Sequence, residues 1–504
     1  MRTLVALPLA LRLALAAALP VGAAAQVHYH EDGGPWKQRA RSGPDAEVDG
    51  WLYNLGVTGL RVRLDAGAPT HLVVGHVFAD SPASRRIEVG DRIVGAGGRD
   101  FGTPHRNGYG MDVFGPQGPI DDFATALDAA LGSKKKRLRL RVQRDGDERD
   151  VALKLPRRAD AYERSFPEDC DRTETVRDRL YEYLLEHQRD DGSWGNPVHD
   201  TFAPLALLGS GERSHRSAVE ANVRYHARRT SREDDSSLVN WKYMAAAIVM
   251  SEWYLATGDR WVLKELQEVY EFLHASQYVD LAQVASTVKD SHPDSLPSDA
   301  EQQHGGWGHN IGFEGYGPIA MLTGQGALAF ALMGRCGIEI DEERHRAAYD
   351  FLARGTGSNG YVWYADEVAG DRDWADMGRT GASGIAHWVS PFREHRAVAR
   401  THALLIAEHP ESFPDTHGSP LMGMGYAALA AFVHDASFER LMAANRWWFV
   451  LAECPDGSFA YQPNRDNAGY GADARLAASA VTAFILSLPE KGLFLTGKRS
   501  KFAR

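Results

Sequence analysis

Acidic, imidazole and aromatic side chains recur just ahead of stretches rich in small apolar residues in the C-terminal part of the sequence. Glu314 lies in a glycine-rich aromatic segment, residues 306–317, which has no helical spacing or capping position of its own. Asp376 and His199 precede two other such stretches. Carboxylates and imidazoles in one cleft are suited to acid and base catalysis on a glycan. We therefore name Glu314, Asp376 and His199 as candidate catalytic residues, with a structural role for Glu314 and a solvated Asp376 as the alternatives.

Further residues at the same kind of position would line a cavity if the stretches that follow them run side by side. They are Asp200, Asn240, Trp241, His309, Tyr316, Arg379, His417, Tyr470 and Asp473. Asp200 and Asp473 also fit helix N-caps, whose side chains accept backbone N–H groups. His199 and His417 also fit loop histidines held by hydrogen bonds.

The small-residue stretches indicate the helices that must position these side chains. Six of them are apolar nearly all round, which predicts buried helices: 201–208, 241–256, 319–333, 381–389, 421–432 and 474–488. The stretches between them, such as 173–188 and 262–276, carry charge on one side and belong outside. Six outer and inner pairs predict a closed (α/α)6 toroid over residues 170–490, with a central ligand cavity.

The predicted hairpin loops repeat a glycine turn followed by an aromatic residue. Gln188 to Gly195, with Thr201-Phe202-Ala203 after it, resembles the repeat of terpenoid cyclases and protein prenyltransferases, and the pattern returns around Trp307 and Phe459. The resemblance implies their toroid fold. It does not imply their activity, because the Asp-x-Asp-Asp acid motif of squalene-type cyclases is missing.

Shorter alternating runs precede this region and predict strands. They are 60–64, 72–77, 92–94, 138–142 and 150–155, with a helix at 120–131 and a hairpin turn at Asp145-Gly146. These runs predict a small mainly β domain, residues 48–156, and so a multidomain chain.

The β region resembles the PDZ domain of bacterial proteins, through Ser81-Pro82-Ala83 and Val89-Gly90-Asp91-Arg92-Ile93. The resemblance makes Asn54, Leu55, Gly56 and Val57 the loop whose N–H groups receive a peptide's terminal carboxylate. A long loop at 101–119 departs from the pattern and could cover the groove. The β region has two alternative roles: it binds a peptide or protein segment, or it only braces the second domain.

The N-terminus and the charge balance restrict the class of protein. Residues 1–25 resemble a signal peptide, with Ala23-Ala24-Ala25 before the expected cleavage site, and a retained membrane anchor is the alternative. We expect a polar lead-in at 26–47, a linker at 157–169, a C-terminal tail at 491–504 and no later membrane span. The mature protein would be exported to the periplasm or the cell exterior. A net charge of −11 argues against a nucleic-acid partner.

Three scattered cysteines provide no CxxC metal site, so we expect no metal and no other cofactor. Whether Cys170 and Cys454 pair is left open. The whole arrangement resembles an uncharacterised family of exported bacterial proteins. The first interpretation is therefore a protein that binds a peptide through the PDZ-like domain and a glycan or other small ligand in the toroid. The alternative is a carbohydrate-active lyase or hydrolase with acidic residues at the toroid mouth.

Overall fold

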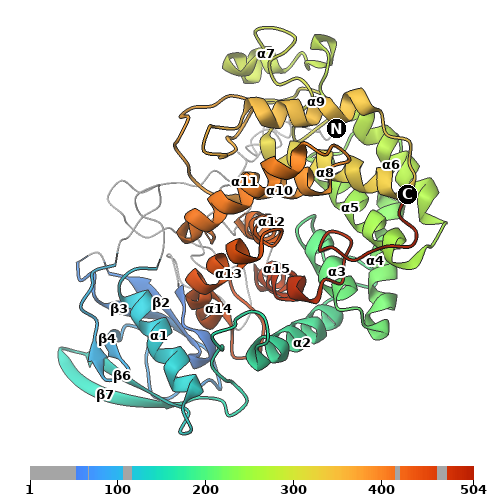
Figure 1. The fold of residues 1–504 in the computed structure, drawn as a ribbon. Helices are drawn as coiled ribbons and strands as arrows, with labels where there is room; N and C mark the ends of the chain where they lie inside the picture. The colour runs from blue at the N-terminus through green and yellow to red at the C-terminus, as the bar shows by residue number, and fades with distance from the viewer. Residues whose placement is uncertain (1–52, 66, 106–115, 415–419, 462–473) are drawn as a thin grey trace, which may run out of the picture.

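The computed structural model describes residues 53–65, 67–105, 116–414, 420–461 and 474–504. The expected signal peptide and lead-in lie outside these residues, as do His417, Tyr470 and Asp473 and most of the loop at 101–119. The described chain forms a small sheet with one helix, and a larger body of helices (Figure 1).

The sheet is antiparallel, and α1 packs on it. In chain order, the strands and the helix of this region are β1 (Tyr53–Asn54), β2 (Leu60–Leu64), β3 (Leu72–Val77), β4 (Arg92–Ala96), β5 (Arg99–Asp100), α1 (Pro119–Gly132), β6 (Arg137–Arg144) and β7 (Asp147–Lys154). The strand order is β1-β2-β3-β4-β6-β7, and β5 pairs with β4. Asp145 and Gly146 join β6 to β7 with positive φ angles of 53° and 90°, so the predicted hairpin turn is confirmed. We call residues 53–154 the β module.

The helices alternate between an outer and an inner layer. The outer helices are α2 (Asp171–Glu186), α4 (Arg216–Arg229), α6 (Val262–Ser276), α9 (Glu342–Arg354), α11 (His395–Glu408), α13 (Asp435–Ala444) and α14 (Arg446–Ala452). The inner helices are α3 (His199–Gly209), α5 (Val239–Thr257), α8 (Ala320–Cys336), α10 (Gly378–Val389), α12 (Pro420–Ala431) and α15 (Ala474–Ser487). Each inner helix packs on the next, and α15 returns to α3, so they form a closed ring. The predicted helical toroid is confirmed.

The starts of neighbouring inner helices lie side by side. The amide of Asn240, at the start of α5, donates to the carbonyl of His309 in the loop before α8 (3.2 Å). The amide of Ala320, at the start of α8, donates to the carbonyl of Tyr364 in the loop before α10 (2.8 Å). We call the end of the ring where these loops meet the mouth.

Side chains fill the middle of the ring. The ring of Phe202 in α3 lies 5.7 Å from that of Tyr426 in α12, although α15 separates these helices in the ring order. Gln325 in α8 likewise reaches the sulfur of Met422 in α12 (3.6 Å) past α10. All four side chains are buried. The expected central cavity is therefore packed at this level.

The C-terminal residues, expected to form a tail, pack against the opposite end of the ring. Glu252 in α5 is 1% exposed and accepts the amides of Phe494 (2.9 Å) and Leu495 (2.7 Å). The Ser500 hydroxyl donates to Leu255 O (2.5 Å), and the amide of Arg504 donates to Arg335 O in α8. The segment therefore crosses the C-terminal ends of α5 and α8.

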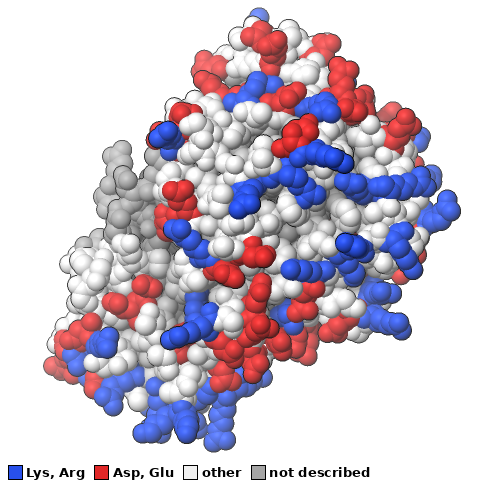
Figure 2. Space-filling view, in the orientation of Figure 1, with Lys and Arg blue, Asp and Glu red and all other residues white. Residues whose placement is uncertain are grey.

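The surface and the cysteines complete the description. Charges of both signs cover the face in Figure 2, and Lys and Arg gather where Figure 1 places β6 and β7; the exposed Lys134, Lys135, Arg137 and Arg139 lie there. The three cysteines are buried and unpaired. No described helix is both long and apolar enough to span a membrane.

Candidate functional site

The loops at the mouth are built by a repeated set of hydrogen bonds. The indole N–H of Trp194 donates to Leu184 O in α2, and that of Trp307 donates to Leu273 O in α6, both at 2.8 Å. Both indoles are fully buried. The glycine turns and aromatic residues seen in the sequence therefore anchor each loop to the outer helix before it.

A side-chain oxygen early in the inner helix holds the amide of each loop. Asp200 accepts the amide of Trp194 (2.7 Å), Thr323 accepts that of Trp307 (3.1 Å), and Thr380 accepts that of Val362 (3.1 Å). Asp200 also accepts the amide of Gly195 (3.3 Å) and the side-chain amide of Asn222 (2.9 Å). We expected Asp200 to cap its own helix or to line a cavity. The carboxylate of Asp200 holds the loop before α3, as the hydroxyls of Thr323 and Thr380 hold the loops before α8 and α10.

Three of the predicted cavity residues meet at the mouth. The indole N–H of Trp241, in the first turn of α5, donates to Nδ1 of His309 (2.8 Å). An indole only donates, so Nδ1 accepts and the imidazole hydrogen is on Nε2. That N–H donates to the hydroxyl oxygen of Tyr316. Burial lowers the pKa of His309, in agreement with this neutral form.

Tyr364, which the sequence interpretation missed, extends this chain. Its hydroxyl donates to the hydroxyl oxygen of Tyr316 (3.2 Å). The oxygen of Tyr316 thus accepts two hydrogen bonds, from His309 and Tyr364, and its own proton meets no acceptor in the part of the chain that the structure describes. Tyr364 directly follows the repeated aromatic loop at 357–363, which is the signal that could have found it. We call Trp241, His309, Tyr316 and Tyr364 the mouth cluster.

A buried ion pair lies beside the mouth cluster. Arg379 and Asp376 are 3.3 Å apart, and Arg379 also donates to the hydroxyl of Tyr361 (2.7 Å). The guanidinium lies 5.7 Å from the ring centre of Tyr364. Asp376 also accepts the amide of Gly378 at the start of α10 (3.3 Å). Asp376, which we expected to be catalytic or solvated, is therefore buried and held by a cation.

Burial moves the pKa of both tyrosine hydroxyls of the mouth cluster further above neutral pH. It raises the pKa of Tyr316 and, more strongly, that of Tyr364. It also raises the pKa of Asp200 to about 6. The mouth cluster is therefore a set of neutral hydrogen-bond donors and half-buried aromatic rings.

The other predicted residues are placed differently. Glu314 is exposed, although it belongs to the loop that carries His309 and Tyr316. His199 is 4% exposed at the start of α3. Asn240 is fully buried; it donates to the carbonyls of Gly308 (2.9 Å) and Asn310 (2.7 Å) and so shapes this loop.

The segment 279–303 lies next to the mouth cluster. Its capping box at Asp280 and Gln283 and its short α7 (Val288–Ser291) give it local order. Its core packs on Phe313, and the amide of Ala285 donates to Phe313 O (2.9 Å). The exposed ring of His292 lies 6.1 Å from that of Tyr316. The segment therefore brings a titratable group to the mouth.

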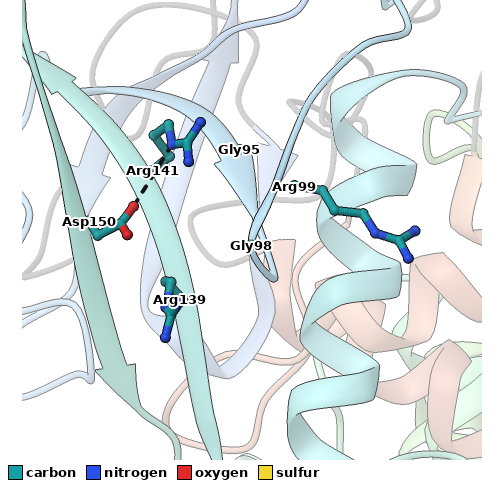
Figure 3. Close-up of a pocket in the computed structure, with 6 residues that line it drawn as sticks. All are labelled: Gly95, Gly98, Arg99, Arg139, Arg141 and Asp150. Atoms are coloured by element: carbon teal, nitrogen blue, oxygen red, sulfur yellow. Dashed lines mark ion pairs between the residues drawn. The ribbon is translucent and has the colours of Figure 1, made fainter.

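Two other kinds of site receive less support. Among the described residues, no three His, Cys, Asp or Glu side chains are grouped to hold a metal ion. A hollow of about 70 Å³ on the β module is lined by Gly95, Gly98, Arg99, Arg139, Arg141 and Asp150 (Figure 3). Arg141 pairs there with Asp150 (3.8 Å) and with Asp100 (2.6 Å), so the hollow is small and its charge is partly balanced.

The molecule is therefore a closed ring of helix pairs that carries a small antiparallel β module. Residues 173–497, more than half of the chain, match the family described as Domain of unknown function (DUF6288). The chain belongs to this family. Comparison with curated protein sequences finds no match.

Several solved structures are similar to the helical ring at low identity. An α-1,6-mannanase, GH76A of Salegentibacter sp. HEL1_6, is 14% identical over 63% of this chain and 99% of its own, with a TM-score of 0.45. The type II terpene cyclase MstE from Scytonema is 12% identical over 63% and 99%, with a TM-score of 0.38. The Lin0763 protein from Listeria innocua is 10% identical over 63% and 97%, with a TM-score of 0.45. We draw no functional conclusion from these similarities.

Proposed function

We propose that the helical ring is a carbohydrate-active enzyme, a lyase or hydrolase, that binds a glycan at its mouth. The observation that carries this proposal is the hydroxyl of Tyr316, whose oxygen accepts bonds from His309 and Tyr364 and whose proton has no acceptor among the described residues. The half-buried rings of Trp241, Tyr316 and Tyr364 offer flat apolar faces beside these polar groups, as sugar-binding sites do.

Two donated hydrogen bonds favour Tyr316 as the proton donor, although burial raises its pKa and so makes the hydroxyl a weaker acid. Its raised pKa keeps the hydroxyl intact near neutral pH. Tyr316 protonates the sugar oxygen as its C–O bond breaks, while a base removes a neighbouring C–H proton in a lyase or activates the water that adds to the carbon in a hydrolase. The two bonds from His309 and Tyr364 then stabilise the phenolate. His309 cannot donate through Nδ1, because Trp241 occupies that nitrogen. His309 therefore acts through Tyr316, as a positioning residue.

The described carboxylates fit a two-carboxylate hydrolase less well. That mechanism needs two carboxyl groups about 5 to 10 Å apart, one of which is a free acid. Asp376 pairs with Arg379, Asp200 holds a loop, and Glu314 is exposed. Glu314 remains our candidate for the base that works with Tyr316, because a single residue, Gly315, separates them in one loop.

The test is a screen of the mature protein against neutral and acidic polysaccharides. New reducing ends report cleavage, and ultraviolet absorbance of an unsaturated sugar separates a lyase from a hydrolase. We expect Tyr316→Phe to lower kcat by about 100-fold or more, since a general acid contributes on that order. Tyr349→Phe is the matched control, because its hydroxyl donates to Ala386 O (3.0 Å) away from the mouth cluster. Equal activity of both variants would reject the role of Tyr316.

We further propose that the β module is a PDZ-like domain and that the chain acts in the periplasm or outside the cell. The order of its strands, with α1 before β6, supports the first point, and the signal-like residues 1–25 support the second. Peptide binding at Asn54, Leu55, Gly56 and Val57 stays a prediction. All four residues are buried, so a peptide would need neighbouring chain to move away.

A further inference from the structure

The loop between β1 and β2 is covered by the helical ring. The side-chain amide of Asn54 donates to the carbonyls of Leu451 (2.6 Å) and Glu453 (3.1 Å), at the C-terminal end of α14. A Cβ atom on Gly56 would lie 2.5 Å from the carbonyl oxygen of Val450, and the φ of Gly56 is +64°. The loop and the end of α14 therefore meet backbone to backbone, at a position where only glycine fits.

The end of α14 presents hydrogen-bond acceptors to the loop. The last carbonyls of a helix have no partner inside the helix, and they carry the negative end of the helix dipole. A peptide carboxylate presents the same kind of acceptor. The end of α14 thus offers acceptors of the kind a peptide would bring. The donor is the side chain of Asn54, since the amide of Leu55 donates to Leu60 O (2.8 Å) within the β module.

The other end of α14 is also held by the β module. Arg446, the first residue of α14, forms an ion pair with Asp128 of α1 (2.5 Å). It also donates to the carbonyls of Glu163 (2.9 Å) and Tyr162, just before the first ring helix. The short helix α14 is therefore fixed at its start by α1 and at its end by Asn54.

This contact lies on the seam where the ring closes. Glu453 follows α14 and forms a buried ion pair with Arg172 of α2, the first helix of the ring; their side chains are 4% and 2% exposed. Arg179 of α2 lies 3.4 Å from the same carboxylate. Glu453 thus joins the first and last hairpins, and Asn54 binds the carbonyl of that same residue.

We propose that the β module holds the end of α14 as an internal ligand, and that this clasp reinforces the seam between the first and last hairpins, where α15 packs on α3. The loop Asn54 to Val57 then recognises a segment of its own chain. A peptide with a free C-terminus can occupy the loop only after α14 has left it.

The test compares full-length variants by hydrogen–deuterium exchange of the amides of α14 and α2. Asn54→Ala removes both bonds to the end of α14, and Arg446→Met removes the ion pair at its start while leaving the loop intact. We expect the α14 amides to exchange about tenfold faster in each, since losing one or two hydrogen bonds shifts an opening equilibrium by about that factor. The matched control is Asn359→Ala, whose exposed amide donates to Asp373 O (3.1 Å) within a ring loop.

A second measurement covers the case in which Asn54→Ala fails to fold. The wild-type chain is titrated with a library of peptides that carry free or amidated C-termini, with the exchange of α14 followed in parallel. We expect no binding that depends on the carboxylate. The proposal is overturned if carboxylate peptides bind while α14 stays protected. It is also overturned if Arg446→Met leaves the exchange of α14 at the wild-type rate. Neither result bears on the activity of the mouth cluster.

Discussion

Replacing Asp200 tests whether its carboxylate has a structural or a catalytic role. Asp200 is 3% exposed and accepts three donors: the amides of Trp194 and Gly195 and the side chain of Asn222. Asp200→Ala leaves these donors without a partner, and each buried unsatisfied donor costs about 1–3 kcal/mol. Partial relaxation of the loop reduces the sum, so we expect a loss of about 4 kcal/mol in the free energy of unfolding.

Two milder replacements sharpen this prediction. Asp200→Thr imitates Thr323 and Thr380, which hold the corresponding amide in other repeats, so it should recover the bond to Trp194 and lose about 2 kcal/mol. Asp200→Asn keeps one acceptor oxygen but turns an N–H₂ group toward a donor, so it should lose a similar amount.

Urea unfolding at constant m-value measures these differences. The reasoning fails if Asp200→Ala loses less than about 1 kcal/mol. It also fails if Asp200→Asn folds with wild-type stability but has no turnover on a glycan that the wild type cleaves. The second result would give Asp200, predicted from the sequence to line the cavity or cap its helix, a catalytic role instead.

Two buried titratable groups give further predictions. His402 donates to Gly360 O (2.8 Å), and burial lowers its pKa from 6.5 to about 4, so its contribution to stability is present above pH 6.5 and lost as the pH falls through 4. From pH 6.5 down to pH 4, the free energy of unfolding measured in urea should fall by about 3 kcal/mol more for the wild type than for His402→Gln. Parallel plots of this free energy against pH for the two proteins would contradict the prediction. Burial raises the pKa of Glu252 from 4.5 to about 7, so its contribution is present below pH 4.5 and lost as the pH rises through 7. Glu252→Leu leaves the amides of Phe494 and Leu495 without an acceptor and should cost about 2–4 kcal/mol, with faster exchange of both amides. Glu252→Gln keeps one acceptor oxygen, so its stability should lie between those of the wild type and Glu252→Leu. Unchanged exchange of the two amides in Glu252→Leu would contradict the anchoring role.

The sequence predicts the elements of this protein well because their patterns are local. Alternation places β2 and β3 at the predicted residues, and inner helices such as α8 and α12 are apolar nearly all round because both of their faces are buried. Repetition of the hairpins then predicts the ring. The packed centre was not predictable, because it depends on contacts such as that of Phe202 with Tyr426 between helices far apart in sequence.

The candidate site was predictable only in part. The sequence placed Trp241, His309 and Tyr316 at helix starts, but it could not show that they bond in one chain or that Tyr364 joins them. It also could not show which backbone amides donate to Asp200, since a carboxylate at a helix start can accept amides of the helix or of the preceding loop.

The β module shows a third kind of limit. A glycine such as Gly56 indicates that another backbone comes close. The sequence does not say whether that backbone is a foreign peptide or the chain's own α14, because the two partners offer the same acceptor groups.

The filled centre of the ring limits how a polymer can be handled. Phe202, Tyr426, Gln325 and Met422 block passage along the ring axis, and the C-terminal segment crosses the far end of α5 and α8. On the proposed function, a sugar chain bound at the mouth could not be threaded along the ring axis past these side chains. Substrate and products would then enter and leave on the same side of the ring.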